Sequence, residues 1–244
     1  MRSSLPERPA EEARRYYDAL SDSYDASRRS PYHRMLDEMA LRIVAPFAQN
    51  QKVLELGCGT GAILAQVAEI AEEAIGVDLS EGMAARASSR GLDVRIAELG
   101  ALPFADASFD LSYSFRVLAH VPDVAGALAE AARVTRPGGH LVLELYNPWS
   151  LRYLAKRLGG PRRIVDSHSE ADVFTRWDSP RDVRAMLPSD VEWLDSYGIR
   201  VVTPLAAVHR VPVFGTALRR AERRLSHSPL KHFGGFLVVV LRRT

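Results

Sequence analysis

The sequence predicts an α/β fold with seven strands in a mostly parallel sheet and helices on both faces. Two observations support this prediction. Strand-sized apolar runs alternate with helix-sized amphipathic segments from residue 52 to residue 147, and repeated strand–helix units of that length are typical of a parallel sheet. A glycine-rich turn also joins the first of these strands to the helix that follows it, an arrangement that places a helix N-terminus beside a ligand.

Two helices are predicted ahead of the first strand. The segment over about 11–23 begins with acidic residues and carries apolar side chains at helical spacing. The second helix covers 31–47 and has one apolar side. That side consists of Met35, Leu36, Met39, Ile43 and Val44.

The alternating part of the chain is assigned from its apolar runs and its glycine punctuation. Strands are predicted at 52–56, 73–80, 93–99, 109–115 and 140–147, with helices at 62–71, 81–91 and 123–135. Gly91 closes the second of these helices. The sequence RPGG at 136–139 ends the third and makes the turn into the fifth strand.

The pattern changes after Asn147, where residues 148–178 are predicted to be an insertion of helix and loop. Ser179 can cap a short helix whose first position is Pro180. Two closing strands are predicted at 191–202 and 235–243. The amphipathic helix between them, about 215–226, has Leu218, Ala221 and Leu225 on one face and charge on the other, as expected for a solvated surface helix.

Composition restricts the class of protein. A chain of 244 residues with 47% hydrophobic and 25% charged residues fits one α/β domain over 1–244. The single cysteine, Cys58, permits no internal disulfide, and the polar N-terminus does not resemble a signal peptide, so a cytoplasmic location is expected. No apolar run approaches the roughly 20 residues that span a bilayer, so no integral membrane association is expected.

The glycine loop narrows the choice of ligand. In VLELGCGTG the spacing is G-x-G-x-G over Gly57, Gly59 and Gly61, whereas a dinucleotide-binding loop reads G-x-G-x-x-G. Glycines let the backbone approach a ligand closely. Glu55 stands two residues before the first glycine and would repel a pyrophosphate. The loop therefore suits a ligand that carries amine or hydroxyl groups.

A second carboxylate lies at the end of the second predicted strand. Asp78 follows Gly61 by 17 residues, and an acidic residue at this place in an open α/β sheet can accept both hydroxyls of a ribose. A free ribose diol together with an amino-acid ammonium group describes S-adenosylmethionine. It describes a nicotinamide dinucleotide poorly.

These motifs resemble those of a known family. In order, they read VLELGCGTG, GVDLSEGM, LPFADASFDL, LAHVPD and RVTRPGGHLVLE. They are similar to the motifs of class I S-adenosylmethionine-dependent methyltransferases, in the group with ubiquinone/menaquinone-biosynthesis and many natural-product enzymes. The resemblance covers about 11–147 well and the last strands loosely. It implies a Rossmann-like sheet with an antiparallel last strand and helical lid insertions.

The resemblance also implies roles for particular residues in holding the cofactor. Glu55 would orient the amino-acid end of S-adenosylmethionine, Asp78 would bind the ribose, and the loop backbone would contact the amino-acid end. The remaining cofactor-binding candidates are Gly57, Cys58, Gly59 and Gly61 in the loop, Leu79, Met83, Glu98 and Leu99 around adenine, and Phe115 beside the methyl group. Relatives more often have Asp at the place of Glu98. Met83 is equally well read as core, and Cys58 as a small turn residue.

Three residues are candidates for the chemistry itself. His120, in LAHVPD, could remove a proton from the acceptor, or it could hydrogen-bond to backbone and shape its loop. Tyr24, with Tyr17, could pack near the methyl group or donate its hydroxyl to the substrate. Arg116 would end the fourth strand beside the methyl group. The segment 11–46 is expected to form a helical lid, and 148–178 and 203–234 are expected to be substrate-side insertions.

The expected partner is a small-molecule acceptor, methylated on oxygen, nitrogen or carbon, in a monomer or homodimer. Arginine-rich stretches leave open an RNA-directed enzyme, although the net charge of +2 makes nucleic acid unlikely. A lipid methyltransferase that uses the basic helix at 215–225 is a weaker alternative, because that segment lacks large apolar anchors. A non-catalytic binding protein is also possible. No metal site is predicted, since no His/Cys cluster has ligand spacing.

Overall fold

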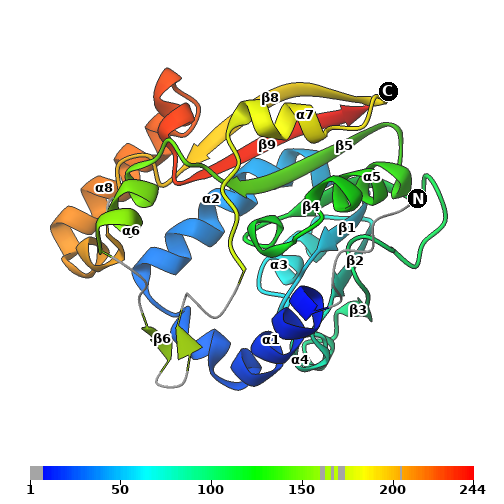
Figure 1. Cartoon of the computed structure of the whole chain (residues 1–244), viewed down its shortest axis with the longest axis horizontal. Helices are drawn as coiled ribbons and strands as arrows, with labels where there is room; N and C mark the ends of the chain where they lie inside the picture. Colours follow the sequence, from blue (N-terminus) through cyan, green and yellow to red (C-terminus); the bar gives the residue numbers. More distant parts are fainter. Residues whose placement is uncertain (1–7, 160–162, 166–167, 170–173, 204) are drawn as a thin grey trace.

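A single seven-stranded sheet forms the centre of the protein (Figure 1). The computed structural model describes residues 8–159, 163–165, 168–169, 174–203 and 205–244. The strands run in the order β3-β2-β1-β4-β5-β9-β8, and β9 is antiparallel to both of its neighbours. The predicted fold class is therefore confirmed. The strands are β1 (Lys52–Leu56), β2 (Glu73–Asp78), β3 (Asp93–Ile96), β4 (Phe109–Ser114), β5 (Thr135–Tyr146), β8 (Val191–Ile199) and β9 (Phe236–Arg243).

Helices and short helical turns connect the strands. The helices are α1 (Arg8–Ser27), α2 (Pro31–Ala48), α3 (Leu64–Ala68), α4 (Glu81–Ser89), α5 (Val124–Val134), α6 (Leu151–Gly159), α7 (Pro180–Met186) and α8 (Pro212–Leu225). The 3-10 turns are η1 (Leu118–His120), η2 (Ala206–Arg210) and η3 (Pro229–Phe233). Ser179 caps α7 in a reciprocal capping box with Asp182, as its position before Pro180 predicted.

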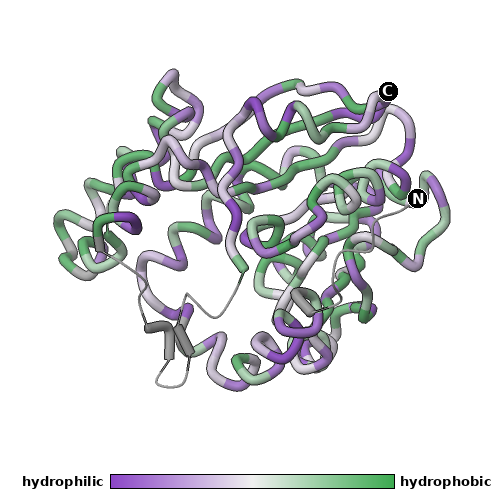
Figure 2. Tube along the Cα trace, viewed as in Figure 1, coloured by the Kyte–Doolittle hydropathy of each residue, from purple (hydrophilic) through white to green (hydrophobic). Residues whose placement is uncertain are grey.

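Two hydrophobic cores pack on opposite faces of the sheet. Because successive strand residues point to opposite faces, Val238 and Val240 join α2 and α3 in one core, whereas Val239 and Leu241 join α5 in the other. Strand β9 is hydrophobic over most of its length, whereas α1 is mostly hydrophilic (Figure 2). Both faces of the central strands are thus buried, which explains their near-continuous apolar sequences.

Several predicted boundaries differ from the structure, among them those of α1, α3, β2, β3, β5 and β8. The segment before Leu64 forms turns, so α3 is much shorter than the predicted helix. Strand β3 ends at Ile96, and Glu98 and Leu99 consequently lie in the loop after it. Strand β5 begins at Thr135, so the RPGG sequence belongs to the strand, where the register with β4 shifts between Phe109 and Leu111. The glycines allow this irregularity, since Gly138 has a φ of +80°.

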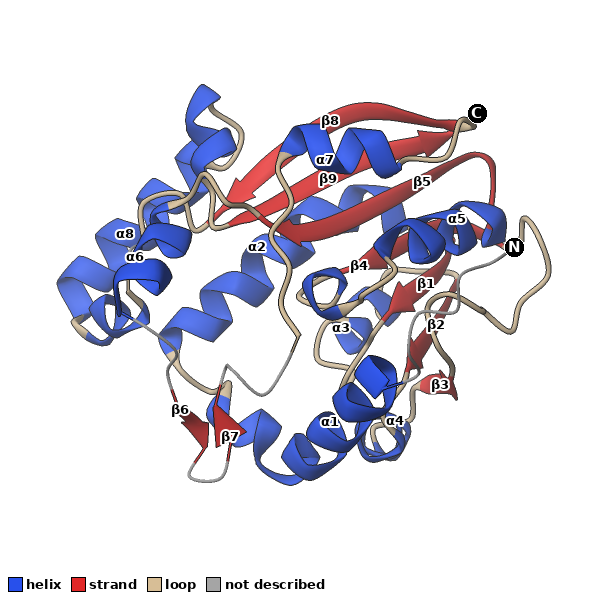
Figure 3. Cartoon of the chain, viewed as in Figure 1, coloured by secondary structure: helices blue, strands red, loops and turns tan. Residues whose placement is uncertain are grey.

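The two insertions also differ from their predictions. A separate two-stranded hairpin, β6 (Arg163–Val165) with β7 (His168–Ser169), follows α6 and stands apart from the main sheet (Figure 3). The prediction that the charged residues of α8 all face solvent was wrong. Glu222 is fully buried, and its carboxylate accepts hydrogen bonds from the backbone N–H groups of Val201 and Val202. It thus satisfies the donors that follow β8, which helical periodicity alone does not reveal.

Helix α8 also begins earlier than predicted. Its first turn exposes Val213 and Phe214, with 79% and 68% of their surface accessible. These two large apolar side chains lie just before the predicted segment 215–225, so they leave the prediction for that segment untested. Within the described ranges, no helix combines the length and apolar character needed to cross a bilayer.

Candidate functional site

A cavity of about 970 Å³ opens at the carboxyl ends of β1, β2 and β4. Its wall combines α1, the β1–α3 loop, the end of β2, the loop after β3, the segment after β4 and Phe174. This volume lies at the upper end of the roughly 300–1,000 Å³ found for ligand pockets. The place matches the edge at which open α/β sheets bind ligands.

The structure brings the predicted site residues together around this cavity, with one exception. Those lining it are Tyr24, Glu55, Gly57, Cys58, Gly59, Asp78, Leu79, Met83, Glu98, Leu99, Phe115, Arg116 and His120. Gly61 is not part of the lining. A side chain there would meet Leu92 and Ala87 instead, so Gly61 serves the packing of α4 against the loop. The functional roles of all these residues stay predictions.

The three glycines of the loop adopt left-handed backbone conformations, with φ of +72°, +55° and +78°. Their surroundings differ. A Cβ on Gly57 would lie 2.5 Å from the Val117 side chain, whereas a Cβ on Gly59 would meet nothing within 4 Å. Since Gly59 lines the cavity, its missing side chain leaves room for a ligand to approach the backbone.

Asp78 joins the two loops that would hold a nucleoside. Its Oδ2 accepts a hydrogen bond from Gly59 N–H at 2.7 Å, and its Oδ1 accepts one from Ser80 N–H at 2.9 Å. Burial raises the pKa of the Asp78 carboxyl, and these backbone donors act in the opposite direction. Each carboxylate oxygen has further acceptor capacity for a ligand hydroxyl.

Glu55 is buried at the base of the cavity and accepts a hydrogen bond from the Tyr113 hydroxyl at 3.2 Å. Burial raises the pKa of Glu55 to about 8. A nearby cation would favour the charged form of this carboxyl. Burial also raises the pKa of the Cys58 thiol, which keeps it protonated and argues against thiol chemistry at this position.

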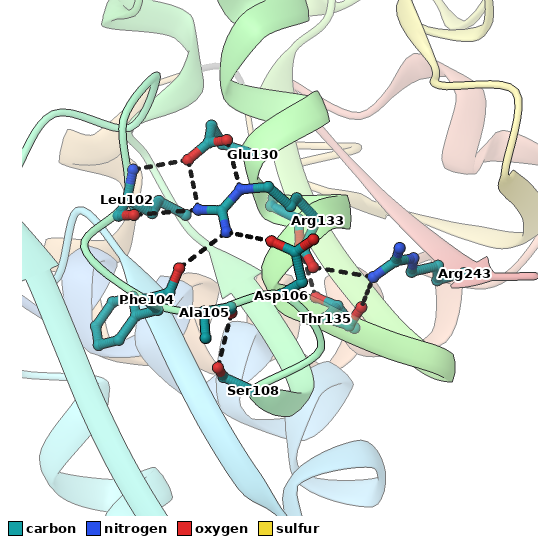
Figure 4. Close-up of polar contacts among 10 residues, drawn as sticks. Leu102, Phe104, Ala105, Asp106, Ser108, Glu130, Arg133, Thr135 and Arg243 are labelled. Carbon is teal, nitrogen blue, oxygen red and sulfur yellow. Dashed lines mark hydrogen bonds and ion pairs between the residues drawn. The ribbon is translucent and has the colours of Figure 1, made fainter.

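The loop after β3 is fixed by Arg133 of α5 (Figure 4). The guanidinium donates to the carbonyls of Leu102 and Phe104 and forms ion pairs with Asp106 and Glu130. Glu130 in turn accepts from the Leu102 backbone N–H at 2.8 Å. This network anchors the segment just after Glu98 and Leu99, two of the residues that line the cavity.

Helix α1 is held over the cavity mainly by its acidic side chains. Asp18 Oδ1 accepts from Ser80 Oγ at 2.5 Å and from Gly82 N–H at 3.0 Å, both at the start of α4. Asp25 accepts from Thr60 Oγ1 at 2.7 Å. Further ion pairs join Asp22 to Arg86 and Asp25 to Arg90. A small apolar cluster of Tyr16, Leu20 and Met83 completes the contact.

His120, in η1, also lines the cavity, and its ring lies 6.4 Å from that of Tyr17 in α1. Its Nδ1 is 2.8 Å from the carbonyl oxygen of Phe174. Because a carbonyl only accepts hydrogen bonds, Nδ1 carries the proton in this contact and Nε2 is the acceptor nitrogen. Nε2 lies 3.4 Å from the Tyr146 hydroxyl. The returning arm of the first insertion thus sets the tautomer of His120.

A charged cluster surrounds Arg116, and of its residues only Arg116 was predicted from the sequence as part of the site. The Arg116 guanidinium forms an ion pair with Asp37 Oδ1 at 2.9 Å, and the Arg28 guanidinium donates a hydrogen bond to the same oxygen at 3.2 Å. Arg28 also donates to the Tyr24 hydroxyl at 3.0 Å. Glu144 accepts from the Arg116 backbone N–H at 3.1 Å. Arg28 and Asp37 stand in helical, charge-rich segments that resemble solvated surfaces, so no sequence signal marks them.

The backbone of Arg116 is itself unusual, because its φ is +64°. A non-glycine residue in this region costs of order 1–3 kcal/mol and is found at sites where the surroundings enforce it. Among the described residues, no group of three or more His, Cys, Asp and Glu side chains is arranged to hold a metal ion.

The chain is similar to known methyltransferases. A family model described as "Methyltransferase domain" matches residues 54–143. The demethylmenaquinone methyltransferase of Paenarthrobacter aurescens is 31% identical over 231 residues, which cover 86% of this chain and 88% of that protein. This similarity extends beyond the glycine loop to most of both chains.

Two solved structures share the fold. An S-adenosylmethionine-dependent methyltransferase from Thermotoga maritima, described as a possible histamine N-methyltransferase, has a TM-score of 0.69 at 20% identity and covers 94% of this chain and 99% of its own. The [4+2]-cyclase SpnF has a TM-score of 0.68 at 19% identity and covers 99% of both chains. Fold, motifs and relatives agree: the chain belongs to the class I S-adenosylmethionine-dependent methyltransferases, with S-adenosylmethionine as its cofactor.

Proposed function

We propose that this enzyme methylates an oxygen, nitrogen or carbon atom of a small-molecule acceptor that binds in the same cavity as the cofactor. The observation that supports this most directly is one continuous cavity of about 970 Å³. Asp78 and Gly59 line it together with His120 and Tyr24. Donor and acceptor held in one cavity react as neighbours, which lowers the barrier through proximity and orientation.

The residues present fit S-adenosylmethionine. The open space beside Gly59 would admit the ligand close to the loop backbone, and Asp78 would accept the ribose hydroxyls. Glu55 would favour the ammonium end, since a cation nearby stabilises its ionised form. Leu79, Met83 and Leu99 supply an apolar wall for adenine. When bound, the cofactor supplies an activated methyl group on a sulfonium.

The chain's own catalytic task would be to position the acceptor and to accept its proton. His120 is suited to this, because its Nδ1–H contact with Phe174 leaves Nε2 as the basic nitrogen. Tyr24 and Arg116 would orient the acceptor from the α1 side and from the end of β4. An acceptor carbon or nitrogen that is already nucleophilic needs only the positioning.

We propose that residues 1–244 act as one methyltransferase domain, with 11–46 as a lid and 148–178 and 203–234 as substrate-side insertions. The polar contacts of α1 with α4 support the lid, and Phe174 on the cavity wall supports a substrate role for the first insertion. The name of the relative demethylmenaquinone methyltransferase suggests quinone-type or aromatic acceptors. A role in specialised metabolism would fit the same acceptor class.

The test is a screen of phenolic, quinone and amine acceptors with purified enzyme and cofactor, followed by S-adenosylhomocysteine release. Turnover with at least one class, slowed in His120→Ala with donor affinity retained, supports the proposal. Binding of S-adenosylmethionine without turnover on any acceptor would favour a non-catalytic role.

A second candidate, methylation at a lipid surface, is favoured by one observation. Helix α6 turns Leu151, Leu154 and Leu158 to solvent, and α8 exposes Val213 and Phe214. Exposed apolar side chains beside basic ones are typical of interfacial helices. Co-sedimentation with vesicles of anionic and of zwitterionic lipid tests this reading, and an absence of binding to both kinds of vesicle would exclude it.

A further inference from the structure

The cluster around Arg116 contains more positive than negative charge. Arg28 and Arg116 share a single carboxylate oxygen, Oδ1 of Asp37. Both arginine side chains are largely buried, with 13% and 14% of their surface exposed. Arg116 Nη1 is buried and has no hydrogen-bond partner in the described structure. A buried donor without a partner is costly and needs an explanation.

The other titratable groups of this region do not remove the excess. Burial, and then Arg28 and Arg116, lower the pKa of His33 to about 4, so it is neutral and adds no charge. Burial raises the pKa of Glu55 to about 8 and that of Glu144 to about 7. Burial thus disfavours the ionised forms of both carboxyls, which weakens their compensation of the second arginine.

The two arginines place the excess positive charge at the wall of the cavity. Arg28 and Arg116 line it, whereas Asp37 lies outside the lining and contacts them from α2. Arg28 also donates to Tyr24, so its guanidinium is fixed from two sides. The left-handed backbone of Arg116, stabilised by the Glu144 contact, directs its side chain to Asp37. Hydrogen-bond donors that are held rigidly before a ligand binds are typical of a binding site.

We propose that Arg28 and Arg116, positioned by Asp37, form a carboxylate-binding subsite in the wall of the cavity. This inference rests on the proposed function and goes beyond it by naming the ligand group. Guanidinium groups recognise planar carboxylates through charge-assisted hydrogen bonds. Two ligands could bring that group: the donor, through its amino-acid end, or an acidic acceptor.

The experiment is calorimetric and needs no turnover. Wild type, Arg28→Gln, Arg116→Gln and Arg116→Lys are titrated with S-adenosylhomocysteine, which has the carboxylate, and with 5′-methylthioadenosine, which lacks the whole amino-acid end. Each protein saturated with S-adenosylhomocysteine is then titrated with 3,4-dihydroxybenzoate and with its amide. Arg223→Gln is the control, because this exposed arginine pairs with Glu38 away from the cavity. Thermal melting verifies that each variant is folded.

If the subsite holds the donor, the glutamine variants bind S-adenosylhomocysteine about 10- to 100-fold more weakly, the factor of one charge-assisted hydrogen bond. Their affinity for 5′-methylthioadenosine then stays unchanged, and Arg116→Lys recovers part of the loss. If the subsite holds the acceptor, only the preference for the acid over the amide disappears. Wild-type behaviour of folded glutamine variants toward all four ligands overturns the proposal. Failure of the wild type to bind either nucleoside instead refutes the proposed function.

Discussion

Replacing Gly59 or Gly57 by alanine distinguishes a glycine that leaves room for a ligand from a glycine that the packing of the fold requires. Both glycines have positive φ, and a left-handed conformation costs an alanine roughly 1–2 kcal/mol. The Cβ of Gly59→Ala enters open space, so this variant loses only that amount, or roughly 2–8 °C in Tm for a chain of this size. The Cβ of Gly57→Ala would lie 2.5 Å from the stiff Val117 side chain. Overpacking adds about 1–3 kcal/mol, for a total of roughly 2–5 kcal/mol.

Ligand affinity, in contrast to stability, should fall more in Gly59→Ala than in Gly57→Ala. The new methyl group of Gly59→Ala would occupy the space through which a ligand approaches the loop, so we expect at least about tenfold weaker binding of S-adenosylhomocysteine at little cost in stability. Scanning calorimetry gives the two Tm values, and isothermal titration gives the affinity. Wild-type affinity in Gly59→Ala would refute the assignment of this loop to the donor. A Gly57→Ala protein as stable as Gly59→Ala would refute the steric argument.

Four further substitutions test other parts of the site. Asp78→Ala should weaken donor binding strongly in calorimetry, because it removes the acceptor for the ribose and releases the Gly59 and Ser80 N–H groups; unchanged affinity would remove Asp78 from the site. His120→Ala should slow turnover without loss of donor affinity, and full activity would leave His120 a structural role only. In the folded protein the pKa of Glu55 is about 8, above the unfolded value of 4.5, so its contribution to stability is complete below pH 4.5 and is lost as the pH rises through 8. Between pH 6 and pH 8, urea melts should show a smaller loss of unfolding free energy in Glu55→Gln than in the wild type. Equal losses would contradict the assignment. Arg133→Gln should cost about 1–3 kcal/mol and weaken donor binding by loosening the loop after β3; a variant with wild-type Tm and affinity would show that the network is dispensable.

Much of the fold is predictable from the sequence because the strands are buried on both faces. The strands 52–56 and 109–115 agree with the structure almost to the residue, since apolar runs bounded by glycine or polar residues have clear ends. The predicted end of β3 was wrong, because Ala97 and Leu99 are apolar for another reason: they pack from the loop against the core.

The lining of the candidate site was predictable from the sequence where its residues stand in contiguous motifs. The glycine loop, Asp78 and His120 stand in contiguous motifs that line the same cavity. Arg28 directly follows α1 and Asp37 belongs to α2, and their meeting with Arg116 depends on tertiary packing. Glu222 shows the same limit, because its backbone partners lie about twenty residues away in the chain.

The ion pairs that attach α1 to α4 bear on how a nucleoside enters and leaves the cavity. If residues 11–46 act as the proposed lid, a nucleoside would enter and leave when α1 detaches from α4. Exposed charge pairs such as Asp22–Arg86 weaken as ions screen them. Under that proposal, a higher salt concentration should speed the release of S-adenosylhomocysteine while the seven-stranded sheet stays folded.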